Sequence, residues 1–84
     1  MLVLAVRGAE RIEAAAIRRA FAMNLEEELS LQNMKKVDLA TLIDCEPSQV
    51  SYWANGVRLP SIENLCRISD VLGVTTDYLL GRES

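Results

Sequence analysis

Hydrophobic and polar positions separate into two faces if residues 48–56, SQVSYWANG, form one helix. At about 100° per residue, side chains three or four positions apart share a face. The apolar face and its continuation consist of Val50, Trp53, Ala54 and Val57. The opposite face carries hydrogen-bonding side chains: Ser48, Ser51, Tyr52 and Asn55. The pattern predicts a helix that buries one side and offers the other side to solvent or to a ligand.

A long helical segment is predicted upstream, from Ala9 to about Gln32. This segment contains no Pro or Gly and is rich in Ala, Glu, Arg and Leu, which favour helices. One continuous helix and two helices with a break both fit this composition. Helical spacing predicts that its apolar stripe consists of Ile12, Ala16, Ala20 and Met23. Asn33 is the expected end, because Asn tolerates the left-handed conformation that often terminates a helix.

Two short helices with a tight connection are predicted next. The first runs from residue 35 or 36 to about Ile43. Its inner face consists of Leu39, Ala40 and Ile43. The connection is Asp44-Cys45-Glu46, and Pro47 begins the second helix because proline is best tolerated in a first turn. We expect Val50 and Trp53 to be core residues that pack against the second and fourth helices of the chain.

A fourth helix is predicted after a break in the helical pattern. Asn55-Gly56 and Pro60 make this break, and Ser61 then caps a helix from Ile62 to about Leu72. The residues expected in register along this helix are Ile62, Leu65, Ser69 and Leu72. Gly73 is a suitable terminator, because glycine adopts the left-handed conformation without strain.

A last short helix is expected around residues 77–80, capped by Thr75 or Thr76 and closed by Gly81. Only four Gly and two Pro punctuate the 84 residues, which favours a helical bundle over a sandwich or barrel. Half of the residues are hydrophobic and a quarter are charged, as in a compact globular domain. We therefore predict one small all-α domain.

Charge and cysteine content narrow the function. A formal net charge of −3 argues against a protein that coats nucleic acid through a strongly basic surface, although a local basic patch would not contradict it. With no His and no C-x-x-C, Cys45 and Cys66 indicate two reduced, mostly buried thiols, and no metal or other cofactor is expected.

Neither catalysis nor a membrane location is indicated. No phosphate-binding Gly-rich loop, nucleophile elbow or paired-carboxylate cleft is evident, so an enzyme fits poorly. The apolar opening, MLVLAV, is shorter than the core of a signal peptide and has no preceding basic segment. We therefore expect a cytoplasmic protein that is neither secreted nor inserted into a membrane.

The two central helices satisfy the geometry of a helix-turn-helix over residues 36–55. The first has an L-A-x-x-I inner face, the second has V-x-x-W, and about three residues separate them. In this arrangement the second helix presents its outer side to the major groove of double-stranded DNA, which is wide enough for an α-helix. DNA is thus a candidate ligand for the polar side of residues 48–56.

Residues Lys35 to Gly81 resemble the Cro and phage-repressor family of helix-turn-helix domains, also called the xenobiotic-response-element family. The resemblance rests on WANGVRLPSIENL, which fits W-x-N-G-x-x-x-P-S-x-x-N-L, and on the closing LGVTTDYLLG. It implies a compact five-helix, lambda-repressor-like domain that binds DNA, is usually a dimer and regulates transcription. In such dimers the half-sites lie about one helical turn apart, so a pseudo-palindromic operator is expected.

The resemblance also implies which residues contact DNA. Lys36 stands where the family usually has Gln and would bind a phosphate as a point charge. Asn55 would meet a phosphate, and Arg58 would lie in the loop that crosses the DNA backbone. Gln49 can pair bidentately with adenine, and the Tyr52 ring can touch a thymine methyl group. The full predicted set is Lys35, Lys36, Pro47, Ser48, Gln49, Ser51, Tyr52, Asn55 and Arg58.

Three departures from the family pattern affect these expectations. Asp44 stands where the turn usually has Gly, which is tolerable because Asp enters the left-handed region more readily than most residues. Ala54 and Leu29 replace a Glu and its Arg partner, so an ion pair and a phosphate-contacting arginine are missing. The third is electrostatic: Glu46 suits the dipole of the recognition helix but opposes a phosphate, or else accepts from a cytosine amino group. We expect weaker affinity for the DNA backbone than in a typical relative.

The first 20 residues lie largely outside the resemblance, which divides the chain into an extension, residues 1–20, and a DNA-binding domain, residues 21–84. The stretch LVLAV could pair with its copy as an edge strand, or AERIEAAAIRRAF could extend the first helix into a dimer contact. A leader without structure is the third alternative. We hypothesise that the extension contributes to self-association.

The function that fits best is a sequence-specific transcriptional regulator, a small repressor of phage or mobile-element type that occludes a promoter as a homodimer. The alternative is a protein-binding module on the same scaffold, such as an antirepressor or antitoxin. A regulatory protein partner would explain the acidic balance and the expected exposure of Val37 and Leu42. A third hypothesis combines DNA binding with a partner protein.

Overall fold

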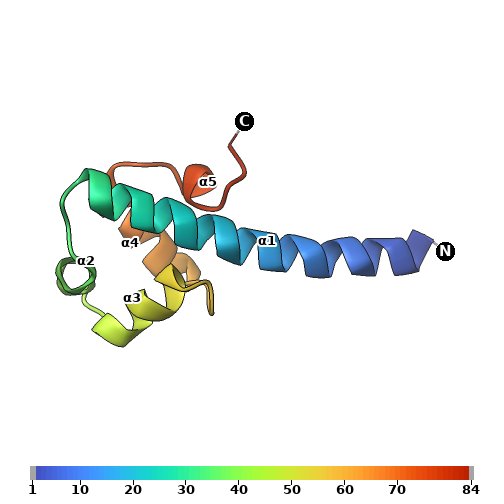
Figure 1. Cartoon of the computed structure of the whole chain (residues 1–84), viewed down its shortest axis with the longest axis horizontal. Coiled ribbons are helices and arrows are strands. Elements are labelled where there is room, and N and C mark those ends of the chain that lie inside the picture. Colours follow the sequence, from blue (N-terminus) through green and yellow to red (C-terminus); the bar gives the residue numbers. More distant parts are fainter. Residues whose placement is uncertain (1, 84) are drawn as a thin grey trace.

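The computed structural model describes the backbone of residues 2–83 and the side chains of residues 14–83. In this part of the chain five helices and no strand are present: α1 (Leu2–Leu31), α2 (Lys36–Leu42), α3 (Pro47–Ala54), α4 (Ile62–Leu72) and α5 (Thr76–Leu79) (Figure 1). The predicted all-α, five-helix fold is confirmed. α1 is one continuous helix, so the break considered for this segment is absent, and LVLAV is helical rather than an edge strand.

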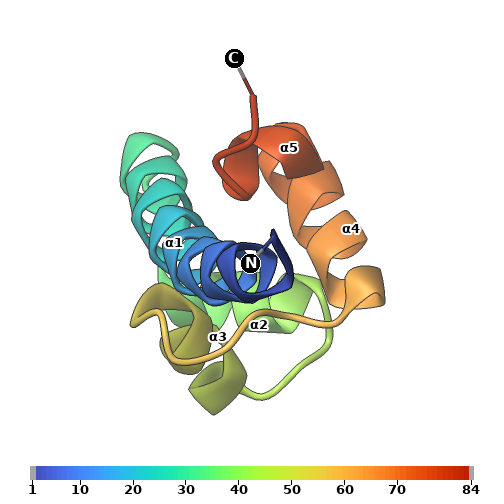
Figure 2. The same ribbon diagram turned by 90° about the vertical axis from the view of Figure 1, so that its right-hand side faces the viewer.

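The core draws apolar side chains from all five helices. Figure 2, which looks along α1, shows α2 and α3 beneath this helix and α4 with α5 beside it. α3 packs mainly on α2 and α1, whereas we expected it to pack on the second and fourth helices. The largest fully buried side chains are Trp53, Phe21, Leu25, Leu39, Ile68, Leu79 and Val50. α1 therefore supplies the surface that positions α3.

The apolar stripe predicted for α1 is wrong. Met23 is 71% exposed and Ala16 is exposed, while Ala20 is only half-buried. The side chain of Ile12 lies outside the described residues. The buried side chains of α1 are instead Phe21, Ala22, Leu25 and Leu29. Large side chains decide which face of a helix is buried, because the free energy gained on burial grows with apolar area.

The signals for helix ends are confirmed. Asn33 and Asp44 both adopt positive φ, at 55° and 57°, and each stands two residues after the last residue of α1 or α2. The Ser61 hydroxyl accepts from the Asn64 amide at 3.2 Å, and the Thr75 hydroxyl accepts from the Tyr78 amide at 3.0 Å. Gly73 is left-handed at φ 70° and ends α4. These ends depend on local backbone chemistry, which a short stretch of sequence carries.

Two apolar positions lie outside the core, against expectation. α3 ends at Ala54, so Val57 follows a turn and is exposed instead of continuing the buried face. Ile62 is 80% exposed, because it is the first residue of α4, while Ile68 and Leu72 are the buried residues of this helix. Helical register alone does not show where a helix leaves the core.

Polar side chains of α1 and of Gln32, the residue after it, hydrogen-bond to carbonyls near the ends of the last two helices. Asn24 Nδ2 donates to the Tyr78 carbonyl at 2.7 Å, and Gln32 Nε2 donates to the Leu72 carbonyl at 2.7 Å. The Tyr78 hydroxyl donates to the Glu28 carboxylate at 3.3 Å. Partial desolvation and the carboxylates of Glu27 and Glu28 raise the pKa of Tyr78. These bonds satisfy carbonyls that a helix end would otherwise leave unpaired.

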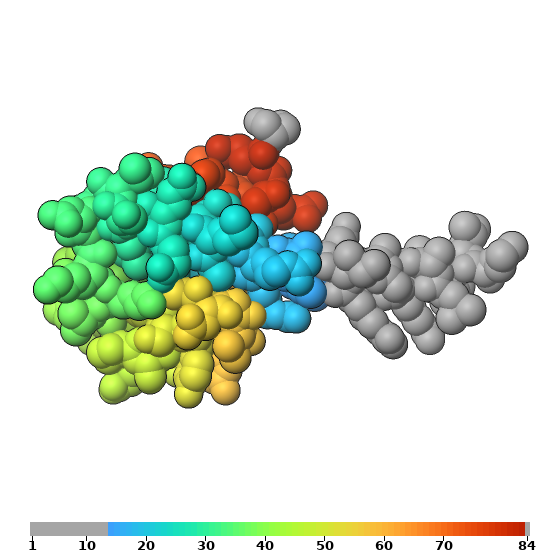
Figure 3. Space-filling view, viewed as in Figure 1, coloured from blue at the N-terminus to red at the C-terminus, as the bar shows by residue number. Residues whose placement is uncertain are grey.

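Residues 16–22 of α1 lie between the loop that follows α3 and the C-terminal turn (Figure 3). A Cβ atom added to Gly81 would stand 2.6 Å from Ala20 Cβ, and Gly81 has φ 73°. A Cβ atom added to Gly56 would lie 3.7 Å from the Arg18 carbonyl oxygen. The domain therefore packs against α1 upstream of Phe21.

The two cysteines are free thiols, as predicted, but they are less buried than expected. Cys45 is half-buried, and Cys66 is exposed on the outer side of α4. Partial burial, followed by the charges of Glu46 and Asp44, raises the pKa of the Cys45 thiol, so this group stays protonated at neutral pH.

Candidate nucleic-acid interface

The turn between α2 and α3 forms from short-range backbone bonds and one left-handed residue. The Cys45 amide donates to the Ala40 carbonyl at 2.9 Å, directly after Asp44 with its positive φ. Glu46 then precedes the first residue of α3, Pro47. Proline suits this position, because its missing N–H would have no partner inside the helix. The turn positions α3 against α2 over the span predicted for the helix-turn-helix.

The two sides of α3 have opposite environments. Val50, Trp53 and Ala54 belong to the hydrophobic core. Outside, Ser48, Tyr52 and Asn55 are exposed and Ser51 is half-buried. Among the described residues, the side chains of Ser48, Ser51 and Asn55 hydrogen-bond to no other group of the protein. This outer row is free to exchange its water for a polar ligand.

Gln49 occupies the border between the two sides of α3. Its side chain is half-buried, whereas Pro47 and Ser48 are exposed. Within the part of the chain that the structure describes, the Gln49 amide group also makes no hydrogen bond. A Gln at the border can still extend along the outer side, because its three side-chain torsions give it reach.

The three predicted cations have different surroundings. Lys35 is exposed and directly precedes α2, where its backbone N–H donates to the Asp38 carboxylate at 3.0 Å. Lys36, the first residue of α2, has its Nζ 3.2 Å from Glu26 Oε1 of α1. The Arg58 guanidinium carbon lies 4.9 Å from the centre of the Tyr52 ring. The structure thus brings Tyr52 and Arg58 together and pairs Lys36 with a residue that sequence reasoning missed.

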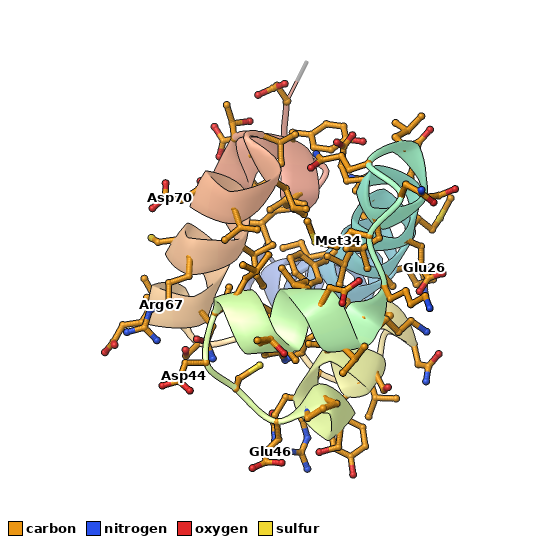
Figure 4. The ribbon with its side chains drawn as sticks, turned by 90° about the vertical axis from the view of Figure 1, so that its left-hand side faces the viewer. Glu26, Met34, Asp44, Glu46, Arg67 and Asp70 are labelled. Atoms are coloured by element: carbon orange, nitrogen blue, oxygen red, sulfur yellow. The ribbon has the colours of Figure 1, made fainter. Side chains whose placement is uncertain are left out.

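Glu26 could not be found from the sequence, because nothing local links it to Lys36. The two residues are ten positions apart and lie on different helices, so their pairing depends on how α1 and α2 are placed. Figure 4 shows Glu26 at the start of α2, at the other end of this helix from Asp44. Glu46 lies apart from both, at the start of α3, and its side chain makes no capping hydrogen bond.

Apolar residues occupy the two positions where the family pattern has a Glu–Arg ion pair. Ala54 and Leu29 both belong to the hydrophobic core, where neither leaves a charge unpaired. The same exchange removes a basic side chain from the edge of the candidate interface. Among the predicted site residues, those that carry positive charge are Lys35, Lys36 and Arg58.

Neither a metal cluster nor a membrane span is found in the described part of the chain. Residues 14–83 contain no group of three or more His, Cys, Asp or Glu side chains suited to a metal ion. No helix described by the structure is both long enough and apolar enough to cross a bilayer.

Comparison with known proteins agrees with this geometry. The fold and the exposed outer side of α3 define a protein of the helix-turn-helix class. A family model described as Helix-turn-helix matches residues 25–79, which include all of α2 to α5. The chain belongs to this family, which is of the Cro/C1 type, and is a DNA-binding transcription regulator. Neither the curated proteins nor the solved structures provided a match.

Proposed function

We propose that this regulator is a small Cro-like repressor that binds a pseudo-palindromic operator as a homodimer in the cytoplasm. The observation that carries the proposal is the outer row of α3, where Ser48, Ser51 and Asn55 lack partners within the described chain. Hydrogen-bonding side chains on an exposed helix can read base edges in the major groove. Occlusion of a promoter by the bound dimer would then repress transcription.

The predicted site residues divide into two roles under this proposal. Pro47, Ser48, Gln49, Ser51 and Tyr52 face the bases or the groove wall. Lys35, Lys36, Asn55 and Arg58 contact phosphates, which sets affinity and orientation but carries no sequence information. Because Glu26 pairs with Lys36 and Glu46 stands at the start of α3, we expect modest affinity for the DNA backbone at physiological ionic strength.

The first test is selection of bound duplexes from a random pool at low and moderate salt, followed by sequencing of the enriched fraction. Enrichment of a pseudo-palindrome would support a dimeric reader of sequence. Enrichment of a single half-site would support DNA reading and contradict the dimer. No enrichment at either salt concentration, from protein shown to be folded by circular dichroism, would contradict the proposal.

A protein-binding module of the antirepressor or antitoxin type is the second candidate function. It is favoured by a groove between the end of α2 and α4, lined by Leu42, Ile43, Asp44, Arg67, Asp70 and Val71. Leu42 is 59% exposed, and the lining carries two carboxylates, Asp44 and Asp70, against one cation, Arg67 (Figure 4). Failure of the selection would make a search for a basic protein partner the next experiment.

We also propose that residues 1–20 contribute to self-association and that residues 21–84 bind DNA. Because Ala20 packs near Gly81, a truncation at Phe21 would remove contacts of the domain itself. A protein that begins at Ala14 keeps these contacts and loses only residues 1–13. Sedimentation should show weaker self-association for this shorter protein, and an unchanged association constant would contradict a role for the removed residues.

A further inference from the structure

The ion pair between Glu26 and Lys36 connects two helices that do not rely on each other for packing. α2 packs mainly on α3 and α4, while α1 packs mainly on α3 and α5. The side chains of Lys36 and Glu26 are 42% and 52% exposed, so both partners are largely hydrated. Exposed ion pairs of this kind contribute little to stability. The fold therefore does not explain why a carboxylate of α1 lies at the start of α2.

Lys36 is also one of three cations available at the candidate interface with DNA. In the free protein its ammonium group is 3.2 Å from Glu26 Oε1. A phosphate that approaches this ammonium must replace the carboxylate or accept a second negative charge close to it. Both alternatives lower affinity, because an ammonium that a carboxylate already neutralises displaces fewer of the cations condensed on the DNA.

We infer that Glu26 is an affinity-determining residue that competes with the DNA phosphate for Lys36. This inference rests on the proposed function, since it assigns to Lys36 a phosphate contact. The competing carboxylate comes from α1, outside the helix-turn-helix, so the placement of α1 sets how much positive charge α2 offers to DNA. Glu26 thereby weakens contacts with the DNA backbone, which do not depend on the DNA sequence. It leaves base reading by α3 unchanged.

The test compares four proteins on one duplex: the full-length wild-type chain, Glu26→Gln, Lys36→Ala and the double variant. The duplex is one enriched in the random-pool selection, and affinity is measured over a series of salt concentrations. Glu26→Gln should bind about two- to fivefold more tightly at low salt, the range that an exposed pair permits. For this variant, the slope of the logarithm of the association constant against the logarithm of the salt concentration should become steeper by up to about one, because one more phosphate is neutralised.

The double variant separates competition for Lys36 from general repulsion. If Glu26 acts through Lys36, Glu26→Gln should give no gain when Lys36 is already replaced by Ala. A gain of the same size in both backgrounds would overturn the inference, because Glu26 would then act only through its long-range charge. Thermal unfolding of all four proteins checks that affinity changes do not reflect loss of the fold.

Glu63→Gln is the matched control. Glu63 pairs with Arg67 Nη2 at 3.7 Å on the exposed side of α4, a helix that contains none of the predicted site residues. Removing this carboxylate changes the net charge by the same amount, so it should leave affinity nearly unchanged. An equal gain from Glu63→Gln would overturn the inference.

The outcomes also separate this inference from the proposed function. Binding by the wild-type protein with no gain in Glu26→Gln would overturn the inference and leave the proposed function standing. Absence of binding by wild type and Glu26→Gln at every salt concentration, from folded protein and with any duplex of the pool, would overturn both. Binding by Glu26→Gln alone would support both.

Discussion

The inner and outer sides of α3 come from the same short stretch of sequence but serve different purposes. Val50, Trp53 and Ala54 pack into the core, mainly against α1 and α2, and contribute to stability through apolar burial. Ser48 and Asn55 lie opposite, and their side chains make no hydrogen bond to another described residue and contribute little to the fold. A substitution should therefore change either stability or DNA binding, according to the side on which it falls.

The largest effect is expected from Trp53→Ala on the inner side. Removing a buried indole leaves a cavity and should lower the free energy of unfolding by about 3–5 kcal/mol. For a domain whose total stability is on the order of 5–15 kcal/mol, part of the population should unfold. Chemical denaturation measures this change. Tyr52→Ala is the matched control on the outer side. Equal losses of unfolding free energy in the two variants would contradict the conclusion that only the inner side of α3 stabilises the fold.

Ala54→Glu should have a similar or slightly smaller effect. It places a carboxylate at a buried position of the core, which should cost about 3 kcal/mol or more in unfolding free energy. Adding Leu29→Arg should restore part of this loss, because it supplies the partner that the family pattern has. Urea unfolding of the single and double variants measures both effects. Ser51→Glu makes the same change on the outer side and should alter stability by less than about 0.5 kcal/mol.

Gln49→Ala tests the border of the two sides. If Gln49 reads a base, the variant should lose about 1–3 kcal/mol of discrimination at one operator position and keep its stability. Repeating the random-pool selection with this variant would show relaxation at that position alone. A loss of thermal stability without a change in the enriched sequence would instead place Gln49 with the inner side.

The smallest effect concerns Tyr52 and Arg58. The stacked guanidinium should lose its position in Tyr52→Leu, which removes an interaction of about 0.5–1 kcal/mol at an exposed site. DNA affinity should fall by about two- to fivefold, and Tyr52→Phe should keep it, since the ring remains. A double-mutant cycle with Arg58→Ala, measured by DNA binding, isolates the coupling. Additive effects of Tyr52→Leu and Arg58→Ala would show that the two side chains act separately.

The sequence predicted best the features that depend on a few neighbouring residues. Asn33, Asp44 and Gly73 adopt the left-handed backbone that ends a helix, as expected from their small or flexible side chains. The limits of α2, α3 and α4 differ from the predicted limits by at most a residue or two. The two sides of α3 also follow from helical spacing, except at Val57, which lies beyond the end of the helix.

Other features depend on where whole helices lie. The spacing of Ile12, Ala16, Ala20 and Met23 fitted a helix but did not show which side the other helices cover. Exposure of Cys66 likewise follows from the orientation of α4 against its neighbours. Both predictions failed because periodicity describes one helix, whereas burial depends on what packs against it.

By itself the sequence determined the helix-turn-helix, because the caps, the turn residues and the two sides of α3 are encoded within short stretches. Only the tertiary structure decided which side of α1 is buried in the core and which charged side chains lie next to their partners. The pairing of Glu26 with Lys36 and the stacking of Arg58 on Tyr52 are examples of this second kind. Electrostatic interactions fall off with distance, so the strength of the interface depends on placements that only folding sets.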